Sequence, residues 1–392
     1  VLRSRDTDLF AQALRTLGAQ IDMLGDSRAQ ITPISSDSPS SERVINCGLA
    51  GTVMRFLPPL AALSSAPTRF DGDEQAYARP LAPLLDVLES LGATLSYHGE
   101  KGHLPFTISG PLKPSSSPIT VDASASSQFF SAMLLVAPLI GGAIIRSNAP
   151  LISLPHIEMT LNMMHEAGLS WTQLGDREWR VDAGAPTASE ITIEPDLSNA
   201  GPFLCAGILS AGSVTIPNWP LASTQPGAQW PSLFDEMGIE TSQETNEMGS
   251  SELTVRGDGP GSFRGIERDM SAMGEMVPTL AALLLFASTP STLTGIAHLR
   301  GHETDRLDAI AQSVTALGGL IEELPDGLRI TPASLHGAPL RSFADHRMAT
   351  FAAIVGLVVD GVSLDDISYT SKTLPEFESI WARMCEESSD NV

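Results

Sequence analysis

One short pattern recurs five times along this chain and limits what it can fold into. In each copy a helix-like stretch ends at a Leu-Gly, Ala-Gly or Met-Gly pair, and a strand-like stretch follows. The glycines lie 74, 76, 70 and 80 residues apart, at Gly18, Gly92, Gly168, Gly238 and Gly318. Glycine ends a helix readily because it adopts a positive φ without steric cost. The near-constant period predicts a repeated helix-and-sheet module of about 75 residues.

A second strand-like segment follows in most copies, so each module has the pattern of a helix, a turn and a hairpin. These segments are residues 104–108, 178–181, 252–255 and 328–331. The runs after the glycines alternate apolar and polar residues, as half-buried strands do. Helix–glycine–strand turns also recur by chance in α/β proteins, and it is the regular spacing that favours a true repeat. We therefore expect an α/β protein of about six modules.

The length of the chain favours two domains of three modules each. The chain has 392 residues, 42% of them apolar, and a single core of that size would be unusual. A turn at 194–196 gives the expected domains 1–194 and 195–392. A module that ends at Gly18 should begin well before Val1, so we expect the first module to be incomplete and an N-terminal segment to precede it.

Charge and cysteine content exclude several classes of protein. The net charge of −23 argues against nucleic acid and anionic membranes as partners. Cys47, Cys205 and Cys385 lie far apart, which fits a reducing cytoplasm and no zinc knuckle. The most apolar stretch, 129–145, is broken by proline and glycine and is not a membrane span. We expect a cytoplasmic protein without a bound metal.

Two stretches in the first half have the composition of anion sites. Small residues in Gly48–Arg55 lead into a helix, and the N–H groups at a helix start attract anions. Arg79 stands just before Pro80 at another helix start, where it could hold a carboxylate or phosphate with both nitrogens. The alternatives are a tight turn in the first case and a surface salt bridge in the second.

A serine cluster forms the third candidate. Ser124, Ser126, Ser127 and Gln128 precede an apolar helix and supply neutral hydrogen-bond donors, and Ser153 could join them from a later turn. Helix capping alone would need only one serine. The surplus of donors favours a site for a phosphate ester.

The second half places three cations at junctions between strands and helices: Arg306, Arg347 and Lys372. In a strongly acidic protein, an anion pocket explains this placement economically. Glu275 leads into the apolar helix 279–287, where it either caps the helix or acts as a general base. Ordinary capping and ion pairing remain the alternative for each of these stretches.

Taken in order, these motifs resemble the 5-enolpyruvylshikimate-3-phosphate (EPSP) synthase family. The matching motifs are GLAGT-x-x-R, DGDE…ARP, DAS-x-SSQF, EPD-x-S, GHETDR, ADHRM and SKT, and they cover nearly the whole chain. Each motif alone is weak, but seven in sequence are strong. GHETDR and GLAGTVMRF resemble the actinobacterial branch. The resemblance implies two inverse α/β domains, barrel-like and each of three βαβαββ modules, which agrees with the period found above.

The resemblance also implies a reaction and a set of site residues. The family transfers the enolpyruvyl group of phosphoenolpyruvate to the 5-hydroxyl of shikimate 3-phosphate, releases phosphate, and needs no metal or organic cofactor. The implied site lies in the cleft between the domains, and we expect a monomer. By motif match, shikimate 3-phosphate contacts Ser126, Ser127, Gln128, Ser153, Glu275 and His302. Phosphoenolpyruvate contacts Gly51, Arg79, Gln128, Arg306, Arg347 and Lys372. Glu275 takes the place of the base near the 5-hydroxyl, and Glu303 that of the proton donor to the methylene carbon.

The chain departs from the family pattern at three points. The N-terminal Lys-Ser…Arg motif has no counterpart, and a protein without it should have weak or no activity. Leu49 stands where many members have Asn, and His302 where many have Lys. Two alternatives remain. The related UDP-N-acetylglucosamine enolpyruvyl transferase matches poorly in the serine cluster and in HETDR, and a non-catalytic remnant would keep the fold without turnover.

Overall fold

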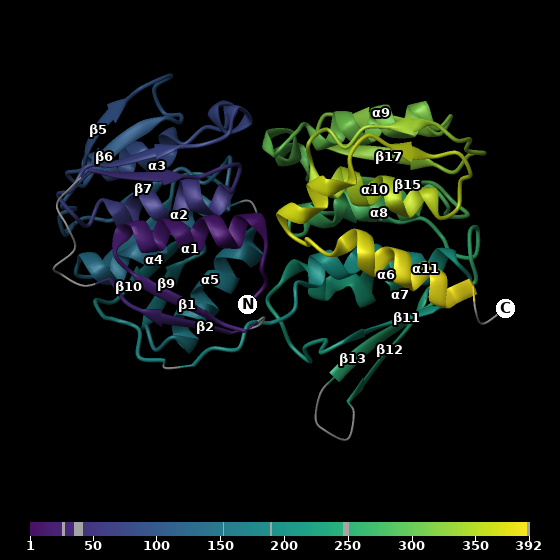
Figure 1. The fold of residues 1–392 in the computed structure, drawn as a ribbon, viewed down its shortest axis with the longest axis horizontal. Coiled ribbons are helices and arrows are strands. Elements are labelled where there is room, and N and C mark those ends of the chain that lie inside the picture. Colours follow the sequence, from purple (N-terminus) through teal and green to yellow (C-terminus); the bar gives the residue numbers. More distant parts are fainter. Residues whose placement is uncertain (26–27, 35–41, 152, 189, 246–250, 390–392) are drawn as a thin grey trace. The chain divides into compact units, whose positions relative to one another are not determined.

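The computed structural model describes residues 1–25, 28–34, 42–151, 153–188, 190–245 and 251–389 (Figure 1). It divides the chain into two units, Val1–Ile193 and Glu194–Val392. Each unit has its own hydrophobic core, built from residues of that unit alone.

Two four-stranded sheets in the first unit share one strand order. The first sheet contains, in spatial order, β3 (Arg43–Asn46), β4 (Thr68–Asp71), β6 (Phe106–Ser109) and β5 (Thr94–Tyr97). The second contains β7 (Ile119–Val121), β8 (Ala143–Ser147), β10 (Glu178–Val181) and β9 (Trp171–Gly175). In both, the first two strands are parallel and the other pairs antiparallel. An antiparallel pair, β1 (Gln20–Leu24) and β2 (Arg28–Thr32), completes the strands described in this unit.

Helices of two kinds join these strands. The inner helices connect the parallel pairs and are largely buried: α2 (Gly51–Ala61) and α4 (Ser127–Val136). The outer helices are buried on one face: α1 (Arg5–Leu17), α3 (Ala82–Ser90) and α5 (Leu154–Glu166). Short 3₁₀ turns lie at η1 (Glu74–Ala78) and η2 (Ala137–Ile140). Alternate residues of β4 and β6 are buried, so one face of the sheet packs on the inner helices.

The second unit repeats the same plan. Its four-stranded sheet contains β14 (Glu267–Asp269), β15 (Ser291–Thr294), β17 (Gly327–Thr331) and β16 (Leu320–Leu324), with the first two parallel. A three-stranded antiparallel sheet contains β11 (Ser213–Pro217), β13 (Ser251–Arg256) and β12 (Glu240–Thr245). The parallel pair is β18 (Pro339–Leu340) and β19 (Ser363–Leu364).

The inner helices of the second unit are more deeply buried than those of the first. They are α6 (Leu197–Leu209), α8 (Val277–Leu284) and α10 (His346–Gly356), and every residue of α8 is buried. Figure 1 shows α8 and α10 in the middle of this unit, with β15 and β17 on one side and β11, β12 and β13 on the other. The outer helices are α7 (Trp230–Met237), α9 (Arg306–Ala316) and α11 (Phe377–Ser389). The 3₁₀ turns are η3 (Pro226–Gln229), η4 (Gly274–Met276), η5 (Ala297–Gly301) and η6 (Ile367–Lys372).

The predicted glycine boundaries are confirmed. All five repeat glycines have a positive φ, from 76° at Gly318 to 111° at Gly18, and each lies between a helix and a strand. The expected inverse α/β arrangement is also confirmed, because α8 is buried throughout and α6 at every residue but Asn199.

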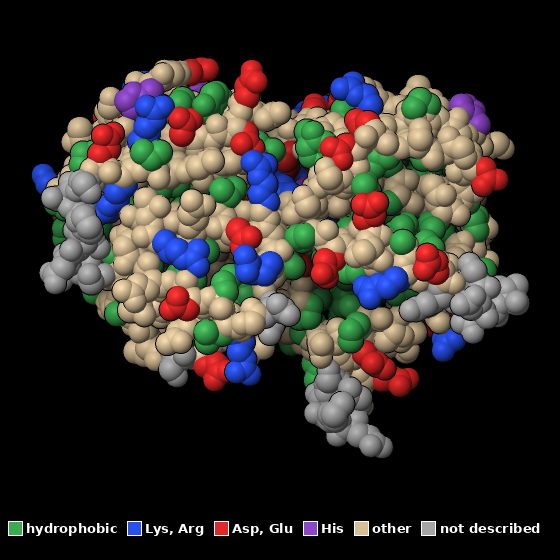
Figure 2. All heavy atoms as spheres, viewed as in Figure 1, with side chains coloured by type: hydrophobic (Ala, Val, Ile, Leu, Met, Phe, Trp, Pro, Cys, Tyr) green, Lys and Arg blue, Asp and Glu red, His purple; other side chains and the backbone are tan. Residues whose placement is uncertain are grey.

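One face of the molecule is polar and mixed in charge. Figure 2 shows acidic and basic side chains interspersed on the face that it draws, with hydrophobic side chains in small groups between them. Within the described residues, none of the helices is both long enough and apolar enough to cross a bilayer.

Candidate active site

In the first unit, the predicted small-residue turn leads into α2. Asn46 ends β3, and its side-chain oxygen accepts a hydrogen bond from the Gly48 amide at 2.8 Å. Gly48 has a φ of +52°, and α2 begins three residues later at Gly51. No side chain caps this helix, because Ala50 occupies the N-cap. The first amides of α2 therefore lack a side-chain acceptor at their N-cap.

Three polar side chains surround Gly51. A Cβ atom placed there would lie 3.2 Å from Arg79 Nη2, 3.3 Å from Gln128 Oε1 and 3.5 Å from Arg55 Nη1. Arg55 Nη1 donates to Gln128 Oε1 at 2.7 Å, and Arg79 Nη1 donates to the Leu49 carbonyl at 3.1 Å. Arg55 and Arg79 are buried, so the surface salt bridge considered for Arg79 is wrong. Two buried guanidinium groups beside a glycine form a cradle suited to an anion.

The serines of the predicted cluster make different local hydrogen bonds. Ser126 is the N-cap of α4, and its hydroxyl accepts from the Gln128 amide at 3.3 Å. The Ser124 hydroxyl donates to Asp122 at 2.6 Å, and this hydrogen bond lowers the pKa of Asp122. Ser127 is buried in the first turn. Capping thus uses Ser126 alone among these serines.

Ser153 lies at the start of α5, in a left-handed conformation with a φ of +51°. Its side chain makes no capping hydrogen bond with α5. The helices α4 and α5 are neighbours, because Thr160 donates to Ser131 at 2.8 Å. Among the described residues, no hydrogen bond joins Ser153 to the serines that open α4.

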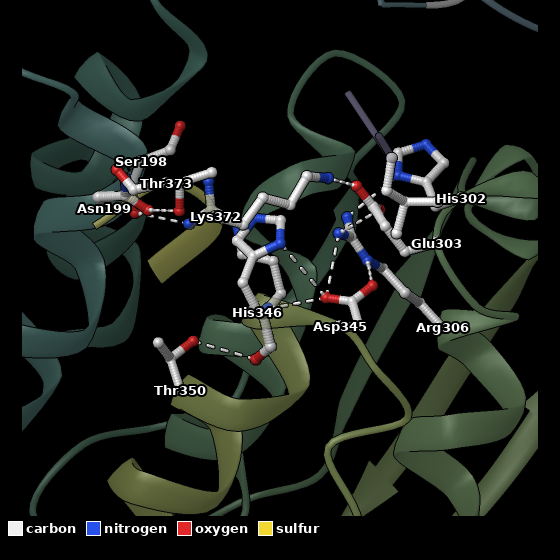
Figure 3. A network of polar contacts seen from close by, with 12 residues as sticks. Ser198, Asn199, His302, Glu303, Arg306, Asp345, His346, Thr350, Lys372 and Thr373 are labelled. Carbon is white, nitrogen blue, oxygen red and sulfur yellow. Dashed lines mark hydrogen bonds and ion pairs between the residues drawn. The ribbon is translucent and has the colours of Figure 1, made fainter. Parts of the chain in front are cut away.

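In the second unit, Arg306 is the centre of a buried polar network (Figure 3). Its Nε donates to Asp345 Oδ2 at 2.8 Å and its Nη2 to Asp345 Oδ1 at 3.2 Å, a bidentate pair. Its Nη2 also donates to Glu303 Oε2 at 3.0 Å, and its Nη1 lies 3.0 Å from His302 Nδ1. Since a guanidinium can only donate, His302 Nδ1 is the acceptor and the ring proton lies on Nε2.

Lys372 reaches the same network from η6. Its ammonium forms an ion pair with Glu303 Oε1, so the Glu303 carboxylate lies between Lys372 and Arg306 (Figure 3). Arg347 lies in the first turn of α10, and Oδ1 of the N-cap Asp345 accepts from the Arg347 amide at 2.7 Å. The Arg347 side chain donates to the Ser198 carbonyl in α6 at 3.1 Å. The helices α6, α9 and α10 and the 3₁₀ turn η6 thus meet at these cations.

Burial and charge set the ionisation of the network. Burial would raise the pKa of Asp345, but the net result is a pKa below its ordinary value, and the charge of Arg306 is the main influence that lowers it, helped by the hydrogen bonds from Arg306. Burial lowers the pKa of His346 to about 3, so this histidine is neutral at neutral pH. Burial also lowers the pKa of Arg347, which remains charged because a guanidinium starts so high.

Glu275 lies in η4, directly before α8, and is partly buried. Its charge acts on both Arg306 and Arg347. The N-cap of α8 is Met276, and its side chain makes no capping hydrogen bond. The structure therefore places Glu275 within electrostatic reach of two predicted anion-binding arginines.

Each unit brings together a subset of the predicted residues. The first unit gathers Gly51, Arg79 and Gln128. The second gathers His302, Glu303, Arg306, Arg347 and Lys372 around Asp345. Sequence reasoning did not assign roles to Asp345 or Arg55, although both lie inside the quoted motifs. The sequence feature that could have identified them is that each is an ionisable residue in the same motif as a predicted ligand residue.

Comparisons with known proteins agree on one family. A profile of the family described as EPSP synthase (3-phosphoshikimate 1-carboxyvinyltransferase) matches residues 1–381. Proteins named 3-phosphoshikimate 1-carboxyvinyltransferase from Bifidobacterium longum and Kocuria rhizophila are each 45% identical over 98% of this chain. The matches cover 88% and 86% of those proteins.

Solved structures show the same fold. An EPSP synthase from Acinetobacter baumannii has a TM-score of 0.79 at 21% identity and covers 97% of this chain and 88% of its own. The enolpyruvyl transferase NikO from Streptomyces tendae has a TM-score of 0.70 at 20% identity, covering 97% and 87%.

Proposed function

This chain belongs to the EPSP synthase family, and from that premise we propose that it is a 3-phosphoshikimate 1-carboxyvinyltransferase. It transfers the enolpyruvyl group of phosphoenolpyruvate to the 5-hydroxyl of shikimate 3-phosphate and releases phosphate. The observation that carries the proposal is the cluster formed by the buried Arg306 and Arg347 and the partly buried Lys372. Buried, fixed cations stabilise phosphate and carboxylate groups far better than solvated ones.

The other residues take the following roles in this proposal. Arg79 and Gly51 hold phosphoenolpyruvate together with the three cations. Shikimate 3-phosphate is held by neutral donors and by the network histidine: Ser126, Ser127, Gln128, Ser153 and His302. Both substrates are anions, and the cations let them approach one another. The steps can run without a resident cofactor, since acid and base side chains suffice for each.

Two carboxylates carry the proton transfers. Glu275 takes the proton of the 5-hydroxyl as that oxygen bonds to C2 of phosphoenolpyruvate, and Glu303 gives a proton to the methylene carbon C3. The tetrahedral adduct then loses a proton from the new methyl group while the bond from C2 to the phosphate oxygen breaks. Phosphate leaves, and the carbon–carbon double bond is restored.

An assay of phosphate release tests the proposal. The protein is mixed with phosphoenolpyruvate and shikimate 3-phosphate, and both products are followed by ³¹P NMR. Phosphate and enolpyruvyl product should form in equal amounts and only when both substrates are present. UDP-N-acetylglucosamine in place of shikimate 3-phosphate should give no release. Release with the sugar nucleotide, or none with either acceptor, contradicts the proposal.

We also propose that the protein works in the cytoplasm as a monomer. Cys47 and Cys205 are buried thiols outside any disulfide, as expected for a reducing compartment. Sedimentation analysis with and without the substrates tests the oligomeric state.

A further inference from the structure

Glu303 is held in a state that conflicts with giving up a proton. One of its oxygens pairs with Lys372, and the other accepts from Arg306 Nη2 at 3.0 Å (Figure 3). A carboxylate between two cations is ionised, and an ionised carboxylate only accepts hydrogen bonds. The proposed reaction nevertheless needs a protonated acid at this position.

The pairing is shielded from water. The side chain of Glu303 is 8% exposed, that of Lys372 15% and that of Arg306 3%. The charge of Arg306 is shared with Asp345, which binds it with both oxygens. Among the described ion pairs, Lys372 by contrast pairs with Glu303 alone. If Lys372 bound another anion instead, the positive charge acting on Glu303 would fall more than it would if Arg306 did so.

Other charged or titratable groups face this carboxylate from several elements. They are Arg306 on α9, Lys372 on η6, Asp345 and His346 at the start of α10, and the neighbouring His302. Glu275 on η4 acts on the same Arg306. Asp345 and Glu275 are acidic, and burial keeps His346 neutral at neutral pH. Once Lys372 is redirected, Glu303 keeps its contact with Arg306 but has lost that with Lys372.

We propose that a phosphate-bearing ligand converts Glu303 into an acid by taking Lys372 from it. The ligand dianion binds the Lys372 ammonium, the Lys372–Glu303 ion pair breaks, and the Glu303 carboxylate takes up one proton from solvent. Two effects drive the uptake: the lost cation, and the ligand's negative charge close by. No other bond forms or breaks. This rests on the proposed function for the roles of both residues.

The coupling has a thermodynamic signature. Anion binding should take up at most about one proton per chain, and affinity should rise by at most about tenfold for each unit that the pH falls. The rise continues until Glu303 is protonated in the free protein as well. Sulfate is a suitable probe, because it is a tetrahedral dianion like phosphate but has no proton to exchange near neutral pH.

Titration calorimetry of sodium sulfate into the whole protein measures this uptake. The titration is run at one neutral pH in two buffers of different ionisation enthalpy, and the difference in heat gives the protons exchanged. We expect a fraction of a proton taken up on binding. Glu303→Gln should bind sulfate with no uptake, and Lys372→Gln should bind it weakly. The exposed Lys101→Gln serves as the matched control and should behave as the parent protein.

The lysine signals give an independent readout. The chain has only three lysines, so protein labelled with ¹³C at lysine Cε gives three signals. The Lys372 signal, assigned with the Lys372→Gln variant, should move on adding sulfate, while those of Lys101 and Lys113 stay in place. Sulfate that does not bind, binds without proton uptake, or keeps its uptake in Glu303→Gln overturns the proposal. So does a Lys372 signal that sulfate leaves unmoved.

Neither measurement needs turnover. A chain that takes up the proton but releases no phosphate would keep this coupling and lose the proposed function. A chain that turns over without sulfate-linked uptake would keep the function and lose the coupling.

Discussion

At the scale of single residues, Asp345 supports two of the proposed phosphoenolpyruvate ligands. It binds Arg306 with both oxygens and accepts a hydrogen bond from the Arg347 amide, and its side chain is fully buried. Removing one partner of such a buried pair leaves an uncompensated charge, which typically costs about 3–5 kcal/mol. Asp345 therefore acts through Arg306 and Arg347 as a positioning residue.

Asp345→Asn tests this role. The amide keeps the size of the side chain but loses the charge that faces Arg306. We expect the KM for phosphoenolpyruvate to rise at least about tenfold, with the free energy of unfolding lowered by about 2–4 kcal/mol. Steady-state kinetics and urea denaturation measure the two effects. Asp308→Asn, an exposed position on α9, should change neither. Unchanged phosphoenolpyruvate kinetics in Asp345→Asn would remove Asp345 from the site.

Gly51→Ala tests the cradle in the first unit. The added methyl group would lie 3.2 Å from Arg79 Nη2 and 3.3 Å from Gln128 Oε1, so these side chains must shift. We expect the KM for phosphoenolpyruvate to rise about tenfold while the protein stays folded, since a shift of a few tenths of an ångström disturbs an anion cradle more than a core. Gly175→Ala is the control, because nothing lies within 4 Å of its new methyl group. Equal kinetics in both variants would contradict the assignment.

His346 gives a prediction about pH. Burial lowers its pKa from 6.5 to about 3, so between these values the unfolded chain binds a proton that the native protein does not. The free energy of unfolding should therefore fall as pH drops below about 6.5, by up to about 1.4 kcal/mol per pH unit. His346→Gln should flatten this dependence. Urea denaturation at pH 7, 6 and 5 measures it, with the exposed His165→Gln as control. A slope that survives in His346→Gln would assign it to another group.

At the scale of elements, capping side chains start the helices that hold the site. Asp196 caps α6, Asp305 caps α9 and Asp345 caps α10, each by accepting from backbone amides of the first turn. Ser126 does the same for α4. Asp305 and Ser126 stand directly before the predicted ligand residues Arg306 and Ser127, and Asp345 stands two residues before Arg347. In these three helices, the start of the helix and the position of the ligand side chain are therefore fixed together.

Asp196 allows the cap to be separated from the charge. Its Oδ1 accepts from the Ser198 and Asn199 amides, both at 3.0 Å, and its charge also acts on Arg347. Asp196→Ala should lower the free energy of unfolding by about 1–2 kcal/mol, whereas Asp196→Asn should retain most of it, because asparagine caps nearly as well. Thermal denaturation compares them. Equal losses in the two variants would mean that charge, not capping, dominates.

The sequence predicts helix ends and motif positions well, because both depend on local chemistry. The five glycines mark their turns by backbone conformation alone, and GLAGT predicts the start of α2. Contacts between distant residues could not be predicted in this way. Lys372 and Glu303 are 69 residues apart, and only the fold brings them together. Arg79 was open to two interpretations, because burial depends on residues from other elements.

At the scale of the whole molecule, the two hydrophobic cores share no residue. One is built from residues of Val1–Ile193 and the other from residues of Glu194–Val392. Separate cores can melt separately, and then a single unfolding temperature does not describe the chain. Proteins of this size often unfold domain by domain.

Calorimetry of Leu283→Ala tests this independence. Leu283 is fully buried in α8, and a cavity there should cost about 2–5 kcal/mol. We expect two thermal transitions in the parent protein, with only one of them moved to lower temperature by the substitution. Leu134→Ala, at a fully buried position in α4, should move the other. One shared transition displaced by both variants would show that the cores unfold as a single cooperative body.

The aromatic packing on α6 has a consequence for synthesis. Phe203 lies with its ring centre 5.6 Å from that of Phe377 and 5.7 Å from that of Trp381. These partners leave the ribosome about 170 residues after α6. At 5–20 residues per second, the nascent chain carries Phe203 without these two aromatic partners for roughly ten seconds or more. A truncated or stalled product would keep this apolar surface exposed. Chaperones and proteases would therefore be expected to bind such products.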